Sequence, residues 1–223
     1  MIKMSELNRN IEKRLHKILW ESNTDLAEKC LNHPFVIGLA DGSLEQNAFR
    51  IYVAQDAFYL NAFIKAYALA LAKCMDIERI EIFHRFIGGI MDELSLHREY
   101  SNQLGINLKR VEPLSACRAY TDFLLRIAWQ RDVDIIVSAM APCVVLYYFI
   151  GTKLAKRMNP KTDYINWIKT YSSDSMRKFA DETEALLDSV AKDSKEVRDV
   201  YRYAMSLEYD FFDEPLRYGE KLK

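Results

Sequence analysis

Residues 135–152 read IIVSAMAPCVVLYYFIGT, a stretch without a charged side chain. Its length approaches that of a membrane-spanning helix, which needs about 20 apolar residues. Six positions interrupt its apolar character: Ser138, Pro142, Cys143, Tyr147, Tyr148 and Gly151. One isolated segment of this kind is typical of a helix buried on all sides of a protein core. We therefore expect residues 135–152 to form the central helix of an all-α core and not to cross a membrane.

On both sides of this segment, apolar residues recur at helical spacing. The chain of 223 residues has 50% hydrophobic and 28% charged residues, with only 7 Gly and 5 Pro, a shortage that disfavours turn-rich all-β folds. The pattern predicts seven or eight helices, with approximate spans 4–21, 23–32, 45–74, 76–104, 113–131, 133–157, 161–190 and 194–213. Four turn signals fall at breaks between them: His33-Pro34, Asp41-Gly42, Gly105 and Asn159-Pro160. We expect one all-helical domain over residues 1–223, because no linker or repeat divides the chain.

Charge and cysteine content restrict the partners and the compartment. Lys and Arg number 31 against 32 Asp and Glu, and the net charge of −1 gives no sign of a nucleic-acid or anionic-membrane partner. The four cysteines are scattered singly, as is typical of reduced thiols: Cys30, Cys74, Cys117 and Cys143. The N-terminal residues show no apolar segment of a secretory signal. We expect a cytoplasmic protein.

A first candidate site lies in the predicted helix 45–74. Asp56 and Tyr59 are three residues apart and share a helical face with Tyr52 and Phe63. A carboxylate among aromatic rings is costly to bury without a partner. Asp56 is therefore either a ligand anchor or an acid paired with a tyrosine hydroxyl or a lysine, and the spacing leaves both open.

Two further motifs carry a thiol and an acid. Cys143 follows Pro142 and has Tyr147 at i+4; a proline either bends a helix or starts a new one, and both geometries could turn Cys143 towards a cavity. Buried cysteines are mostly inert, so this motif alone fits a nucleophile or a core thiol. Glu208 has aromatic residues at i+3 and i+4, a setting that raises a carboxyl pKa and suits an acid, although pairing with a basic residue is an equal alternative.

Taken in chain order, these motifs resemble the TenA family, also called thiaminase II. The resemblance spans residues 30–213 and is carried by His33-Pro34-Phe35, Asp41-Gly42-x-Leu44, Phe49, Tyr52-x-x-Gln55-Asp56-x-x-Tyr59-Leu60, Leu96-His97, Pro142-Cys143-x-x-x-Tyr147, Trp167-Ile168-x-x-Tyr171 and Glu208. It implies a helical fold like that of haem oxygenase and a homotetramer. It also implies hydrolysis of thiamin or of its breakdown product, 4-amino-5-aminomethyl-2-methylpyrimidine. The product, 4-amino-5-hydroxymethyl-2-methylpyrimidine, re-enters thiamin synthesis, and the reaction needs no metal or organic cofactor.

The resemblance also implies a role for each matched residue. Cys143 would be the nucleophile, Glu208 the acid that protonates the leaving group, and Tyr59 the residue that raises the nucleophilicity of the thiol. Four side chains would bind the aminopyrimidine: Asp56, Tyr147, Tyr171 and Tyr120. A thiolate can add to an electron-poor pyrimidine, and a carboxylate offers two acceptors to an amidine-like edge.

Three positions depart from the family pattern. Glu45 replaces a common proline, Phe212 replaces a frequent tryptophan, and Pro215 is expected to end the last helix early. These departures bear on substrate preference more than on the chemistry.

Two other function classes stay open. Glu93 and His97, at i and i+4, could be ligands in a helical di-iron oxidase, but such a site needs further histidines and none follows His97. His16 is the candidate axial ligand of a haem. The other class is a non-catalytic protein that binds the pyrimidine, and the joint presence of the thiol and both acids favours catalysis over it.

Overall fold

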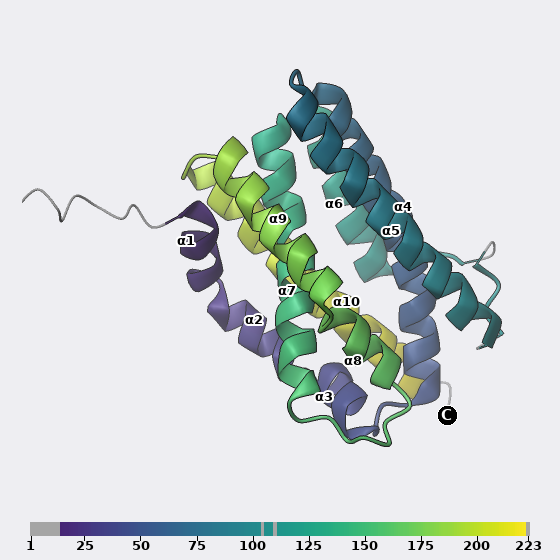
Figure 1. The fold of residues 1–223 in the computed structure, drawn as a ribbon. Helices are drawn as coiled ribbons and strands as arrows, with labels where there is room; N and C mark the ends of the chain where they lie inside the picture. The colour runs from purple at the N-terminus through teal and green to yellow at the C-terminus, as the bar shows by residue number, and fades with distance from the viewer. Residues whose placement is uncertain (1–13, 104, 109–110, 222–223) are drawn as a thin grey trace, which may run out of the picture.

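The computed structural model describes residues 14–103, 105–108 and 111–221, and every regular element within them is a helix (Figure 1). The elements of this part of the chain are α1 (Leu15–Glu21), α2 (Thr24–Leu31), α3 (Pro34–Asp41), α4 (Gln46–Lys73), α5 (Ile77–Gln103), α6 (Ser115–Gln130), α7 (Val133–Ala155), α8 (Ile165–Tyr171), α9 (Asp174–Val190) and α10 (Lys195–Lys221). The all-α prediction is confirmed. The first predicted helix, 4–21, lies outside the described residues up to residue 13.

The uncharged segment forms the middle of α7, in the interior of the bundle (Figure 1). By length and composition α7 could cross a membrane, but most of it is buried inside the protein against α8, α9 and α10. Pro142 lies inside this continuous helix and does not start a new one.

The other long helices enclose α7 and build an aromatic core. α4 packs against α5, α6 and α10, and α10 packs against both α4 and α7, so α10 joins the two sides of the bundle. The largest fully buried side chains are mostly aromatic and include Tyr52, Phe63, Tyr67, Phe83 and Phe212. α1, α2 and α3 run along one side and the lower end in Figure 1.

Helix α3 was missing from the sequence prediction. His33 has extended backbone, as expected before a proline, and its ring Nδ1 accepts a hydrogen bond from the Phe35 N–H at 3.1 Å. Pro34 is the first helical residue, where a proline costs no hydrogen bond. Gly42 ends α3 with φ of 86°, which confirms the Asp41-Gly42 turn. The His33-Pro34 signal therefore starts a helix as well as ending one.

The prediction of one helix over 161–190 is wrong, because the chain breaks between α8 and α9. Ser173 caps α9 by accepting a hydrogen bond from the Met176 N–H at 3.1 Å. α8 in turn lies against α7 at Gly151, where a Cβ would stand 2.4 Å from the Tyr171 carbonyl carbon. The break lets Tyr171 approach the α7 backbone.

Pro215 does not end α10, contrary to expectation. The helix continues to Lys221, because its last turns are held by tertiary packing that outweighs the lost hydrogen bond. The Glu214 carboxylate accepts a hydrogen bond from the Ala116 N–H at 2.7 Å, and a Cβ on Gly219 would lie 2.6 Å from the Ala48 nitrogen.

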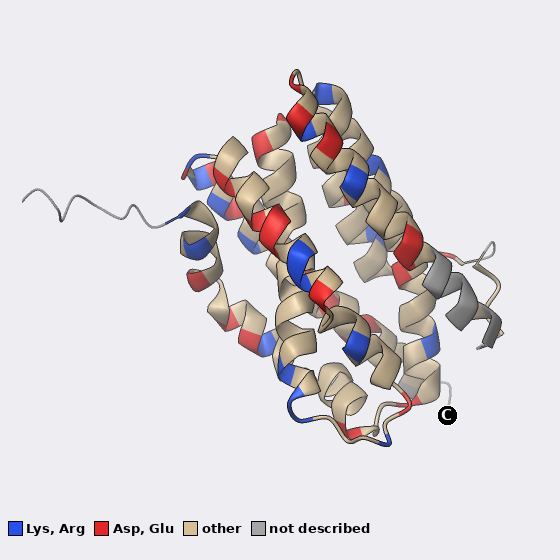
Figure 2. Ribbon diagram, in the orientation of Figure 1, with Lys and Arg blue, Asp and Glu red and all other residues tan. Residues whose placement is uncertain are grey.

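Charged residues of both signs are interspersed along the visible helices, including α5 and α9 (Figure 2). The near-balance of charges, a net −1, thus reflects positive and negative residues that are mixed on the side shown.

Candidate active site

Five of the seven predicted site residues line one small cavity of about 30 Å³. They come from α4, α7 and α8: Asp56, Tyr59, Cys143, Tyr147 and Tyr171. The other two, Glu208 on α10 and Tyr120 on α6, lie behind this cavity in contact with its lining. The seven side chains thus come from five helices: α4, α6, α7, α8 and α10.

Cys143 is half-buried and lines the cavity. Burial raises the pKa of its thiol well above the usual range, and the neighbouring Glu208 raises it further. The Tyr59 hydroxyl acts in the opposite direction, since it stabilises the thiolate. Cys143 is therefore a thiol at rest, with a tyrosine in place to help its ionisation.

Glu208 is buried, and its Oε1 accepts a hydrogen bond from the Tyr120 hydroxyl at 2.7 Å. Burial raises the pKa of this carboxyl to about 8; contact with Tyr120 lowers it, and the charge of Asp56 raises it. The sequence left open whether Glu208 is an acid among aromatic rings or is paired with a basic residue. Its hydrogen-bond partner is a tyrosine, which favours the first alternative. Glu208 thus holds its proton at neutral pH and can donate it.

Tyr59 and Tyr120 form the connection between the cavity and Glu208. Their ring centroids are 4.8 Å apart. The Tyr59 hydroxyl is buried and has no hydrogen-bond partner of ordinary geometry. A buried hydroxyl without a partner in a cavity wall is costly and suits a site that receives a polar ligand or a thiolate.

Several aromatic side chains hold Tyr147. The Tyr52 hydroxyl donates to the Tyr147 oxygen at 3.3 Å and accepts from the Trp167 indole N–H at 3.3 Å. The Tyr147 ring also meets the Tyr171 ring edge to face, with centroids 4.9 Å apart. These contacts fix two flat walls against which a planar ring could pack.

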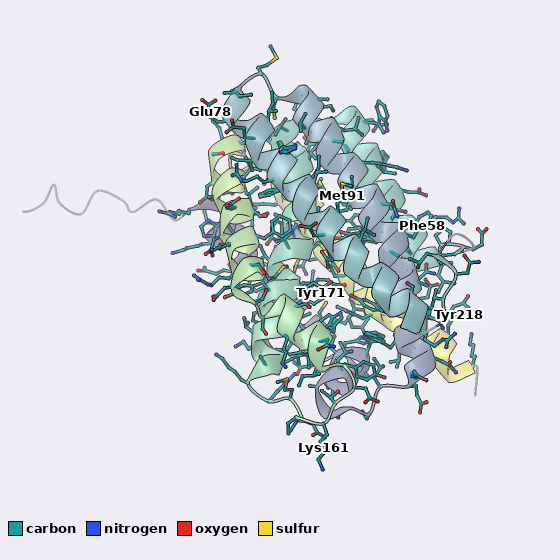
Figure 3. All side chains as sticks on the ribbon, turned by 45° about the vertical axis from the view of Figure 1, so that its right-hand side comes forward. Phe58, Glu78, Met91, Lys161, Tyr171 and Tyr218 are labelled. Atoms are coloured by element: carbon teal, nitrogen blue, oxygen red, sulfur yellow. The ribbon has the colours of Figure 1, made fainter. Side chains whose placement is uncertain are left out.

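Glu93 is a site residue that the sequence analysis considered only as a metal ligand. The Tyr171 hydroxyl donates to its Oε1 at 2.6 Å, across the junction of α8 and α5, and Figure 3 shows Tyr171 at this junction. Glu93 lines the same cavity as Ile90 and lies three residues after it on α5. This shared face with apolar neighbours was the signal that could have found it.

The residues considered for haem or iron have other surroundings. His16 Nδ1 lies 2.7 Å from an Asp188 carboxylate oxygen, and its Nε2 lies 3.8 Å from Glu184, between α1 and α9. Within the described part of the chain, no group of three or more His, Cys, Asp or Glu could hold a metal ion. The side chain of His97 lies outside the described residues.

The other three cysteines are free thiols away from the cavity lining. Cys30 and Cys117 are buried, and Cys74 is half-buried at the end of α4. Burial raises the pKa of Cys117 to about 12. A raised pKa therefore does not single out Cys143; its place beside Tyr59, Glu208 and the cavity does.

Fold and site together define a helical protein of the haem-oxygenase-like class with a thiol and an acid at a small cavity. A protein from Shewanella denitrificans described as having a heme oxygenase-like fold superposes with a TM-score of 0.74 over 96% of each chain at 16% identity, which shows the fold. The chain belongs to the TENA/THI-4/PQQC family, which matches residues 20–218.

Individual relatives agree with this assignment. An aminopyrimidine aminohydrolase from Halalkalibacterium halodurans is 34% identical over 92% of this chain and 95% of its own. A second protein of that name, from Bacillus subtilis, is 32% identical over 74% of this chain and 71% of its own. A solved structure described as a TenA family transcription regulator, from Silicibacter, has a TM-score of 0.84 at 25% identity, covering 90% and 95% of the two chains.

Proposed function

We propose that this protein hydrolyses 4-amino-5-aminomethyl-2-methylpyrimidine, and also thiamin, to 4-amino-5-hydroxymethyl-2-methylpyrimidine in thiamin salvage. The observation that carries the proposal is the meeting of Cys143, Asp56 and Tyr59 in one cavity with Glu208 directly behind. The relatives named aminopyrimidine aminohydrolase support the same activity.

The chemistry follows from these residue types. The Cys143 sulfur adds to an electron-poor ring carbon, and its proton is balanced by protonation of a ring nitrogen. The ring electrons then expel the group on the exocyclic methylene, which leaves as an amine or as neutral thiazole. Water adds to the methylene, the carbon–sulfur bond breaks, and the thiol is restored. Asp56 would accept hydrogen bonds from the amidine-like edge of the ring.

Glu208 would supply the proton that an amine leaving group needs. Its pKa of about 8 keeps it protonated at neutral pH, and its bond from Tyr120 holds it in place. Its contact with Cys143 also suits it to exchange a proton with the thiol.

Purified protein incubated with each pyrimidine, with release of the hydroxymethyl product and of ammonia followed over time, tests the proposal. Turnover should be lost in Cys143→Ser and kept in Cys117→Ser, a buried thiol outside the cavity. Binding of the pyrimidine without turnover in the unchanged protein would instead identify a binding protein. Equal losses in both variants would indicate a folding defect rather than a nucleophile.

We further propose a cytoplasmic homotetramer composed of single-domain chains. Exposed apolar side chains on α4 and α5, including Phe58 and Met91, support an assembly through this side of the bundle (Figure 3). The four free thiols support a reducing compartment. Light scattering of the purified protein tests the tetramer, and a monomer at micromolar concentration would contradict it.

A further inference from the structure

The small cavity beside Cys143 has a second, larger space next to it. A groove of about 440 Å³ lies between α5 and the α8–α9 segment. Four residues line both spaces and separate them: Glu93, Tyr171, Met176 and Phe179. The hydrogen bond from Tyr171 to Glu93 therefore lies in the wall between the cavity and the groove.

The cavity is too small for a substrate and has to enlarge when one binds. A cavity of about 30 Å³ holds about two water molecules, since one water needs roughly 10–15 Å³. A substituted pyrimidine ring is several times larger. A shift of the shared wall would join the cavity to the groove, because the groove lies directly beyond it.

The orientation of the substrate follows from the positions of Asp56 and Cys143. Asp56 and Cys143 line the inner cavity and do not line the groove. A ring held by Asp56 and attacked by Cys143 therefore stays on the inner side. The substituent on its methylene can then extend through the shared wall into the groove.

The lining of the groove indicates what it accepts. Phe86, Met176 and Phe179 give it apolar, polarisable surfaces that suit a flat ring. At its rim Arg85 and Glu182 form an ion pair at 3.5 Å, and the side chains of Ser173 and Ser175 add polar groups. This combination fits a heteroaromatic ring with a polar arm.

We propose that this groove is the leaving-group subsite of the enzyme, which binds a heteroaromatic substituent such as the hydroxyethylthiazolium ring of thiamin. The inference rests on the proposed function and extends it to the part of the substrate that departs. An amine leaving group is too small to occupy the groove, so the subsite affects only substrates with a bulky substituent.

Two adjacent glycines on α5 provide the test. Gly89 lines the groove and Gly88 does not, and a Cβ on either residue would meet no atom within 4 Å. Gly89→Leu therefore adds a bulky side chain at the groove with no clash at its Cβ, and Gly88→Leu is its matched control. Binding of thiamin and of the aminomethyl-pyrimidine is measured by calorimetry in the inactive Cys143→Ser background, so that turnover does not interfere.

We expect Gly89→Leu to raise the Kd of thiamin by at least about tenfold, which corresponds to about 1.4 kcal/mol. The Kd of the aminomethyl-pyrimidine should change by less than about twofold. Gly88→Leu should change neither. Equal losses for both ligands, or an unchanged Kd for thiamin, would overturn the subsite. So would a parent protein that binds the aminomethyl-pyrimidine and not thiamin. If the parent binds neither pyrimidine, the proposed function itself fails, and the subsite with it.

Discussion

At the scale of single residues, the unusual feature of the Cys143 and Glu208 pair is that the carboxyl as well as the thiol holds its proton. Burial raises the pKa of both groups, so the resting site contains a thiol and a neutral carboxylic acid. The proposed nucleophile and the proposed acid are therefore both in their protonated forms before substrate arrives. The proton on Glu208 is available to a leaving group, while the thiol must lose its own.

Glu208→Gln separates proton donation from hydrogen bonding. Because an amine is a poor leaving group and the thiazolium of thiamin departs neutral, we expect kcat with the aminomethyl-pyrimidine to fall by about 10²–10⁴-fold and kcat with thiamin to fall less. Steady-state kinetics with both substrates provide the measurement. Glu214→Gln, also buried on α10 but outside the cavity, is the control and should leave both rates near normal. Equal losses on both substrates, or a change in KM alone, would assign Glu208 to binding or folding.

The same carboxyl predicts a pH dependence of stability. Its folded-state pKa of about 8 lies above the ordinary value of 4.5, so between these pH values the folded chain holds a proton that the unfolded chain has lost. The free energy of unfolding therefore falls as pH rises from about 4.5 to about 8, by up to a few kcal/mol from this group. Urea unfolding of wild type and Glu208→Gln at several pH values isolates this contribution. The difference between their curves should shrink or reverse as pH rises, whereas parallel curves would show that Glu208 is ionised in the native protein.

Much of the site could be predicted because its residues sit in short motifs of distinctive composition. Cys143 and Tyr147 were found from the spacing after Pro142, and the structure brings them into one cavity with Asp56. Tyr120, by contrast, stands in an ordinary helical pattern, and only the family resemblance pointed to it. Glu93 was not predicted as part of this site, because its partner Tyr171 is 78 positions away and no local pattern reports such a contact.

At the scale of helices, periodicity located the long elements and failed where local chemistry interrupts them. α4, α6 and α7 were found close to their ends because their apolar spacing is continuous. α3 was missed because it begins at a proline that also signals a break and ends at the Asp41-Gly42 turn. The gap between α8 and α9 depends on the Ser173 cap, whose signal was hidden within a longer helical pattern. Pro215 misled because tertiary packing is absent from the sequence pattern.

The contact of α8 with α7 at Gly151 predicts a strong effect of one methyl group. In Gly151→Ala the new Cβ would stand 2.4 Å from the Tyr171 carbonyl carbon, so α8 must move away. We expect a loss of about 1–3 kcal/mol in stability and a fall in turnover, since Tyr171 moves with its helix. Thermal unfolding and kinetics measure the two effects.

Gly88→Ala is the matched control, because a Cβ there meets no atom within 4 Å. It should be neutral or stabilise by up to about 1 kcal/mol through helix propensity. If Gly151→Ala behaved like Gly88→Ala, the close approach of α7 and α8 would not constrain the site.

At the scale of the whole molecule, the proposed chemistry uses a thiol and an acid of the bundle and no metal or haem. We expect activity to survive long dialysis against a chelator and the purified protein to be colourless. The ring of His16, the haem-ligand candidate, is engaged by Asp188 and Glu184. Metal analysis and a visible spectrum are the measurements. Iron or haem in stoichiometric amounts that correlates with activity would contradict the expectation.

The charged groups that line the small cavity affect the protonation state in which a ligand binds. Asp56 and Glu93 contribute carboxyl groups, and no Lys, Arg or His lies among the described residues that line it. A ligand that brings positive charge compensates these acids, so a weakly basic heterocycle enters most favourably together with a hydrogen ion from the medium. In thermodynamic terms the site binds two species at once. The heat of association measured by calorimetry then includes the ionisation heat of whichever buffer gives up that ion.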